Sequence, residues 1–78
     1  MKATPRQRIK AVDAAFVAQF HKFPNGSEEK ALFADGFFYA MLKLDRRRSE
    51  RAVVAYEHAM QRLIFTMARH IAGRRGAR

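Results

Sequence analysis

The apolar residues between Ser49 and Ala72 recur every three or four positions, which constrains this part of the chain to an amphipathic helix. Each residue of an α-helix is turned by about 100° from its predecessor, so residues three and four apart share a face. One face of the predicted helix is a continuous apolar stripe of Val53, Tyr56, Met60, Leu63, Ile64, Met67 and Ile71. A stripe of this kind has to be packed against other helices.

The opposite face of the same helix is basic and carries one large aromatic side chain. It consists of Arg51, His58, Arg62, Phe65 and Arg69. Folding requires the apolar stripe but not a row of arginines, so the row indicates a negatively charged partner. The chain has eleven Arg and five Lys, and the planar guanidinium of Arg suits bidentate binding of phosphate or carboxylate. A GC-rich genome would also favour Arg over Lys.

A first helix is predicted near the N-terminus, where Thr4, Pro5 and Gln7 are typical of a helix start. Thr is a good N-cap, Pro fits the first turn, and a Gln three residues after the Thr can close a capping box. The helix is expected to span residues 5–23. Its apolar stripe consists of Ile9, Val12, Phe16, Phe20 and Phe23.

A second helix is predicted over residues 28–47, after a turn at Pro24–Ser27 in which Ser27 is the N-cap. One of its faces holds Phe33, Phe37, Ala40, Met41 and Leu44. Most of its remaining surface is covered by Leu32, Phe38, Tyr39 and Leu42. Because a helix that is apolar nearly all round is buried on two sides, we expect it at the centre of the bundle or at the seam of a dimer. Gly36 within it either admits a close neighbouring helix or marks a bend.

The end of the second helix is ambiguous, because residues 45–50 contain neither Gly nor Pro. Arg46–Arg48 suit a helix C-terminus and Ser49–Glu50 suit a new N-terminus. A break is therefore predicted between them, with a third helix over residues 50–72. The alternative is a single helix from Glu28 to Ala72, which would force dimerisation.

These patterns predict an all-α fold, a small three-helix bundle that forms a homodimer. Residues 1–73 are expected to make one helical domain, with the third helix ending at Gly73, and residues 74–78 a basic flexible tail. A chain of 78 residues without Cys has a small core and no disulfide to support it, which leaves oligomerisation as a source of stability. No segment has the pattern of a secretory signal or of a membrane span, so a cytoplasmic location is expected.

No residues are arranged as a catalytic, metal or cofactor site. The seven acidic residues form no obvious acid–base pair, and His21, His58 and His70 lack the spacing of metal ligands. Ser27 and Ser49 are expected to cap helices, and no Gly-rich phosphate loop is present. We therefore expect a protein that is not an enzyme and that uses no cofactor or metal.

The formal net charge of +9 is unevenly spread along the chain. Residues 45–78 carry nine basic and three acidic side chains, whereas residues 24–44 carry two basic and three acidic ones. A further basic cluster at the N-terminus consists of Lys2, Arg6, Arg8 and Lys10. The expected binding residues are Arg46, Arg47, Arg48, Arg51, Arg62, Phe65 and Arg69.

The charge pattern predicts non-catalytic binding of nucleic acid or another polyanion. The arginines would contact phosphates, and Phe65 would stack on an exposed base unless it is buried against a neighbouring helix or in a dimer. The long third helix and the apolar second helix do not fit a helix-turn-helix, so we expect binding that is largely independent of nucleotide sequence.

A second hypothesis is a small protein-binding module that docks on an acidic surface of a partner protein or ribonucleoprotein. Such a module would act as an adaptor, an assembly subunit or an inhibitor of the kind that phages and mobile elements encode. The excess apolar surface of the second helix supports it, as does the small-residue face of Ala11, Ala14 and Ala18. Insertion into a membrane surface is a weaker reading, because mutual burial explains the apolar residues better.

Overall fold

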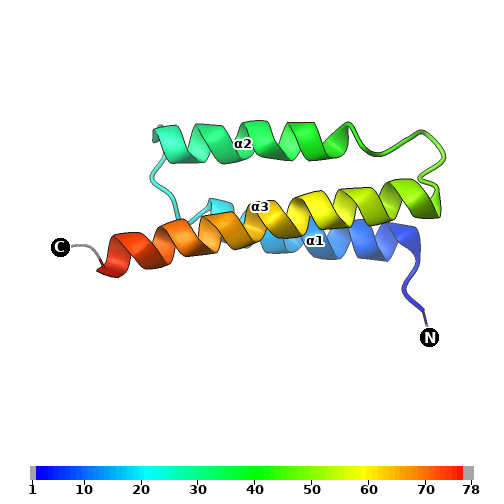
Figure 1. Cartoon of the computed structure of the whole chain (residues 1–78), viewed down its shortest axis with the longest axis horizontal. Coiled ribbons are helices and arrows are strands. Elements are labelled where there is room, and N and C mark those ends of the chain that lie inside the picture. The colour runs from blue at the N-terminus through cyan, green and yellow to red at the C-terminus, as the bar shows by residue number, and fades with distance from the viewer. Residues whose placement is uncertain (1, 77–78) are drawn as a thin grey trace.

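The computed structural model describes the chain from Lys2 to Gly76, with side chains as far as Gly73, as a bundle of three helices (Figure 1). The helices are α1 (Pro5–Phe20), α2 (Glu28–Met41) and α3 (Glu50–Gly76). α1 and α3 run in one direction and α2 in the other, which gives a rod with extents of 46, 25 and 16 Å. The described residues contain no strand, so the predicted all-α bundle is confirmed. Over the same residues, no helix combines the length and apolar character needed to cross a membrane.

α1 begins with the predicted capping box. The Gln7 N–H donates to Oγ1 of Thr4 at 3.2 Å, and the Thr4 N–H donates to Oε1 of Gln7 at 2.9 Å. The helix ends at Phe20, three residues earlier than predicted. Pro24 accounts for the difference, because a residue before proline is disfavoured in the α conformation and the chain closes in tighter turns instead, with the Phe23 N–H on the Phe20 carbonyl.

α2 begins where predicted, with the Lys30 N–H donating to Oγ of Ser27 at 3.2 Å. It ends at Met41, six residues before the predicted boundary at residue 47. The predicted break before α3 is confirmed, and a continuous helix from Glu28 to Ala72 is not formed. The linker of residues 42–49 is longer than the sequence pattern indicated.

Asp45 shapes the second half of the linker. Its Oδ1 accepts the Ser49 N–H at 3.0 Å and its Oδ2 accepts the Ser49 hydroxyl at 2.8 Å. Ser49 in turn caps α3, since its Oγ accepts the Ala52 N–H. These bonds require a turn, in which Arg48 adopts a left-handed conformation with φ of 50°. Short carboxylate side chains compete with helix formation in this way.

α3 continues to Gly76, beyond the predicted end at Gly73. A glycine within a helix is less favourable than alanine by only about 1 kcal/mol, and no proline follows to stop the helix. The backbone of residues 74–76, which were predicted to belong to the flexible tail, is therefore helical. The rest of that predicted tail, residues 77–78, lies outside the described residues.

The core is formed by the apolar stripes predicted for α1 and α3. The most deeply buried side chains are Val53, Tyr56, Met60 and Met67, all from α3. The first helix and the turn after it contribute Ile9, Val12, Phe16 and Phe23. α2 contributes Phe33 and Ala40 as buried residues, with Phe37 and Leu44 partly buried beside them.

α3, and not α2, is the helix that packs extensively against both of the others. The expectation that α2 occupies the centre of the bundle is therefore wrong, whereas its place at a dimer seam stays a prediction. α3 has 27 residues and α2 has 14, and only the longer apolar stripe covers two neighbours. α1 and α2 meet through aromatic rings, with 5.0 Å between the centroids of Phe16 and Phe37.

Gly36 allows α2 to approach α3 closely. A Cβ atom built at Gly36 would lie 2.8 Å from Cδ1 of Leu63 on α3. α2 runs through this position as one unbroken helix (Figure 1). Of the two readings of Gly36, close approach is the one that the structure supports.

The close approach predicts the effect of added volume at Gly36. Gly36→Val is expected to lower the free energy of unfolding by about 1–2 kcal/mol, because the new methyl groups overlap Leu63. Gly73→Ala is the matched control, since nothing lies within 4 Å of a Cβ there, and we expect it to raise stability by up to about 1 kcal/mol. Urea unfolding followed by circular dichroism measures both. Wild-type stability of Gly36→Val would contradict the packing of α2 on α3.

Candidate nucleic-acid interface

The outward side of α3 forms a basic surface, which we call the arginine face. It consists of Arg51, His58, Arg62, Phe65 and Arg69, all of them exposed. At 1.5 Å per residue, this face extends about 27 Å from its first to its last member. The arginine face points to solvent because α1 and α2 cover the other sides of α3.

Phe65 stands near the C-terminal end of the arginine face with 64% of its surface exposed. The guanidinium carbon of Arg69 lies 5.9 Å from the centre of its ring, within range of a cation–π contact. Phe65 also borders a shallow hollow of about 390 Å³ that is shared with His58, Gln61 and Arg62. The ring is therefore not buried against α1 or α2, and one of its faces remains accessible.

The other three predicted arginines, Arg46, Arg47 and Arg48, lie exposed in the linker. Their backbone is shaped by Asp45, whose pKa is held below its usual range by hydrogen bonds from the Ser49 backbone and hydroxyl. Asp45 therefore stays ionised and keeps its hydrogen bonds to Ser49 at the start of α3. The linker arginines are presented on an ordered turn next to the N-terminal end of the arginine face.

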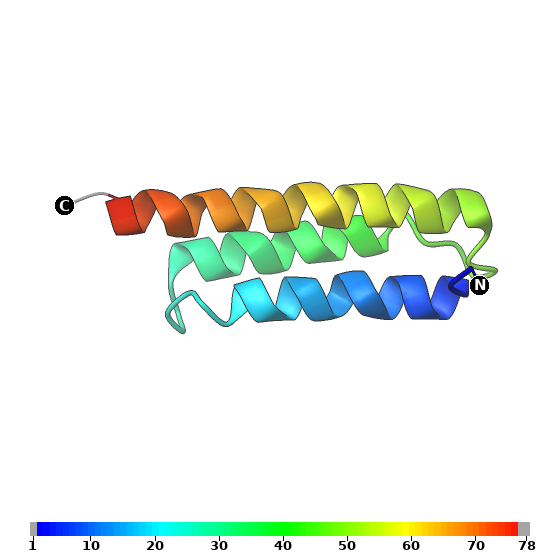
Figure 2. The same ribbon diagram turned by 90° about the horizontal axis from the view of Figure 1, so that it is seen from below.

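The seven predicted residues fall into two groups along the rod. Arg51 adjoins the linker group, whereas Arg62, Phe65 and Arg69 begin about 16 Å further along the helix axis. Figures 1 and 2 both place the N-terminus at the same end of the rod as the linker. The N-terminal basic cluster and the linker arginines therefore share one end of the molecule, which the sequence pattern left open.

Arg8 differs from the rest of the N-terminal cluster, because it bridges α1 to α3. Its Nε donates to Oε2 of Glu57 at 3.1 Å and its Nη1 donates to Oε1 of Glu50 at 2.7 Å, with a further bond from Nη2 to Glu57. Glu50 and Glu57 are seven residues apart and so share a face of α3, a signal that the sequence contained. The bridge uses both acids of α3 and holds them away from the arginine face.

The bridge changes the acid–base properties of its members. The hydrogen bond from Arg8 is the main reason that the pKa of Glu57 lies below its usual range. Within the described side chains, Arg51 and Arg62 make no ion pair. The positive charge of the arginine face is consequently not neutralised by acids of the same helix.

The lowered carboxyl pKa values predict acid-sensitive stability. A carboxyl whose pKa falls on folding stabilises the fold above its unfolded pKa, and this contribution is lost as the pH drops through the folded value. We expect the melting temperature to fall below about pH 4.5, near the unfolded pKa of Glu. Arg8→Met should flatten this decline, because Glu57 then titrates closer to its ordinary range. Circular dichroism melts from pH 2 to 7 measure it, and parallel curves for the two proteins would contradict the role of Arg8.

The arrangement can bind anions and stack on planar groups. Sequence reasoning missed Gln61, which lies at the edge of the apolar stripe, and it did not count His58 among the binding residues.

Among the described residues, no three His, Asp or Glu side chains gather closely enough to hold a metal ion. Comparisons with protein-family models, curated proteins and solved structures give no match to this chain.

Proposed function

We propose that this protein binds nucleic acid without catalysis and largely without sequence specificity, along α3 and the preceding linker. The observation that carries the proposal is an exposed aromatic ring within an unneutralised row of arginines. Phe65 is 64% exposed, with Arg62 and Arg69 on either side of it in the row. Nothing in the packing of a three-helix bundle requires this combination.

The length of the arginine face is suited to a nucleic-acid strand. At the 3.4 Å axial spacing of a fully stacked strand, a face of about 27 Å spans at most roughly eight nucleotides, and an extended single strand places fewer along it. The guanidinium groups supply the phosphate contacts. An affinity based on the three arginines of this face falls with salt along a log–log slope of about −2 on single strands, and contacts from the linker arginines would make the slope steeper.

Phe65 favours nucleic acid over an acidic protein as the partner. An aromatic ring that is accessible on one face and flanked by guanidinium groups can stack on any unpaired base. Stacking of this kind depends little on base identity. Apart from Gln61, the hollow offers no side-chain amide for reading the edge of a base. These features support a single-stranded or locally unpaired ligand.

Charge reversal on the arginine face tests the site. Arg62→Glu with Arg69→Glu is expected to weaken binding at least tenfold, because two phosphate contacts become repulsive. Lys10→Glu with Lys22→Glu changes the net charge equally on exposed positions of α1 and its C-terminal turn, and should change affinity far less. Fluorescence anisotropy with labelled octanucleotides of DNA and RNA measures both. Equal loss in the two variants would show that net charge, and not this face, determines binding.

The linker arginines are tested separately with Arg47→Glu and Arg51→Glu. This double variant is also expected to lose binding while it keeps its helicity, because both residues are exposed. Retained affinity would remove the linker from the site.

The role of Phe65 is tested by its truncation. Phe65→Ala is expected to weaken single-strand binding by about 1–3 kcal/mol and duplex binding much less, because paired bases offer no free face. Phe38→Ala is the matched control, since Phe38 is 63% exposed on a different helix. An equal effect on single strands and duplexes would exclude stacking.

Failure to bind any oligonucleotide at about 50 mM salt would overturn the proposal, because phosphate contacts are strong at low salt. The arginine face would then be assigned to an acidic protein surface, which is the second hypothesis from the sequence. A cross-linking pull-down with the wild-type chain and the Arg62→Glu, Arg69→Glu variant would identify such a partner.

A further inference from the structure

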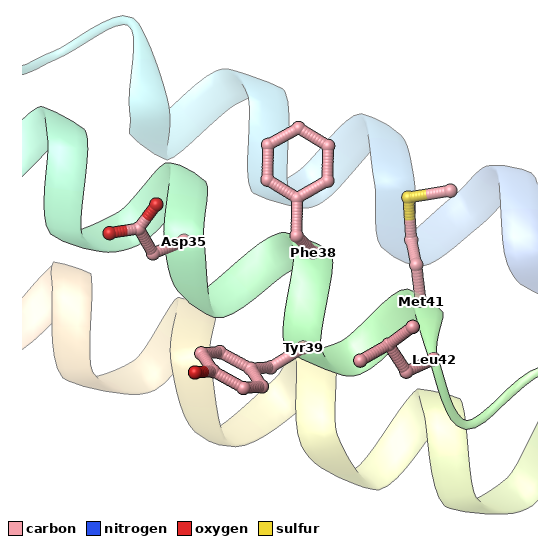
Figure 3. A pocket seen from close by; sticks show the side chains of 5 residues that line it. All are labelled: Asp35, Phe38, Tyr39, Met41 and Leu42. Atoms are coloured by element: carbon pink, nitrogen blue, oxygen red, sulfur yellow. The ribbon is translucent and has the colours of Figure 1, made fainter.

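The side of α2 that points away from the core is apolar and exposed. Its exposed fractions are 67% for Leu32, 63% for Phe38, 73% for Tyr39, 45% for Met41 and 79% for Leu42. We call these five residues, together with Asp35, the outer face of α2. Figure 3 shows five of these six residues, without Leu32, projecting from the same stretch of helix. Solvent-facing helix positions usually carry polar side chains, so this surface needs an explanation.

The spacing on the outer face is that of a helix-pairing seam. Leu32, Asp35, Tyr39 and Leu42 follow one another at intervals of three, four and three residues. This interval pattern is the one by which two helices pack their side chains along a common line. The core side of α2 has its own line of this kind, through Phe33, Phe37, Ala40 and Leu44, so the outer face is a second and unused one.

The area of the outer face matches what a small stable dimer buries. With about 100–150 Å² exposed for each of the five apolar side chains, the face presents about 600 Å². That is at the upper end of the patches found on monomers. Two copies would bury about 1,200 Å² in total, the lower limit of specific protein–protein interfaces.

The charges of α2 permit self-association. From Glu28 to Met41 the helix carries three acidic side chains and one basic one, in a chain whose net charge is +9. The surplus positive charge lies on α3, on the linker and near the N-terminus. Two copies can therefore meet through α2 without bringing their basic surfaces together.

We propose that the outer face of α2 binds the outer face of α2 in a second copy of this chain, with the two helices antiparallel. A two-fold axis near Tyr39 places Asp35 of each copy opposite Lys43 of the other, because both lie four residues from Tyr39. Lys43 is exposed in the linker, two residues beyond the end of α2. The two Tyr39 side chains then meet at the axis, and one Asp–Lys ion pair lies within the seam on each side of it, while Leu32 of each copy reaches the linker of the other.

Phe38 extends the proposed interface toward α1. It lines a groove of about 480 Å³ between α1 and α2, together with Phe16, Val17, Phe20 and Phe37. In Figure 3, Phe38 and Met41 project toward the side where α1 lies. The second copy therefore meets a surface formed by both helices, which gives its α2 more than one line of contact.

The oligomeric state of the full chain tests the proposal. The chain has a mass of 9.0 kDa, so sedimentation velocity at micromolar to 100 micromolar concentrations distinguishes monomer from dimer. We expect a dimer for the wild type. Tyr39→Glu with Leu42→Glu should raise the dissociation constant at least 100-fold and keep wild-type helicity, because both side chains are solvent-facing in the single chain. A wild-type monomer over the whole range would overturn the proposal.

The control for the face is Phe65→Glu, which places a glutamate at an exposed apolar position on α3; it is compared with the single variant Tyr39→Glu, which adds the same charge on α2. The Phe65→Glu variant should remain dimeric. A dimer that survives Tyr39→Glu with Leu42→Glu but is lost in Phe65→Glu would move the interface to α3 and overturn the proposal. If Tyr39→Glu with Leu42→Glu loses helicity, the single variant Tyr39→Gln takes its place, because it removes apolar contact without adding charge. It should also weaken the dimer.

Charge exchange tests the antiparallel arrangement. Asp35→Lys and Lys43→Asp should each weaken the dimer several-fold, and the two changes together should restore it, because the ion pairs are then re-formed with opposite polarity. Additive weakening in the double variant would overturn this pairing of the helices.

The inference is independent of the proposed nucleic-acid site. The Tyr39→Glu, Leu42→Glu monomer should still bind an octanucleotide, since its arginine face is intact. Anisotropy on that variant therefore separates a failure of the dimer from a failure of the binding site.

Discussion

The burial of one side of α3 is the constraint on which the rest of the structure depends. Val53, Tyr56, Met60 and Met67 are almost completely removed from solvent, and no other helix contributes as many fully buried side chains. α1 and α2 are held in place by this stripe. Because a helix has a fixed angular period, burying the stripe also determines which residues face away from it. Packing of α3 therefore determines which positions form the arginine face. Packing does not explain why those positions are occupied by arginines and a phenylalanine.

The polar contacts of α1 with α3 separate the charges of the molecule. Arg8 holds Glu50 and Glu57, and the hydroxyl of the buried Tyr56 donates to the carboxylate of Asp13. Burial and this hydrogen bond raise the pKa of Tyr56 above its usual range, so the hydroxyl stays protonated and donates at neutral pH. The acids of α1 and α3 thereby lie on the side of α3 that meets α1, and the outward side of α3 is left with cations as its only charged groups.

The sequence was sufficient for the helices and their starts but not for their arrangement. Thr4, Ser27 and Ser49 act locally, through hydrogen bonds to N–H groups within three residues, and such caps can be recognised from neighbours alone. The turn before α3 depends on the hydrogen bonds between Asp45 and Ser49, a choice between helix and turn that the run of charged residues obscured. Which helix lies between the others depends on side-chain volume across contacts such as Gly36 with Leu63. A hydrophobic pattern shows that α2 has two apolar sides, but it does not show that only one is covered within the chain. For the same reason, the helical period predicted that Phe65 faces outward from α3 but left open whether a neighbouring helix covers its ring.

The two faces that packing leaves unexplained lie on different helices and differ in chemistry. The outer face of α2 is apolar and belongs to the one helix with a surplus of acidic residues, whereas the arginine face is cationic and belongs to α3. A chain of 78 residues forms a small core and has little stability to spare, so exposed Phe38, Tyr39 and Leu42 are unfavourable unless something covers them. The proposed self-association through α2 would cover them and would add buried area to a small fold. It would also leave both arginine faces exposed, since α2 and the outward side of α3 do not coincide. In this proposal, assembly and ligand binding use separate surfaces of the molecule.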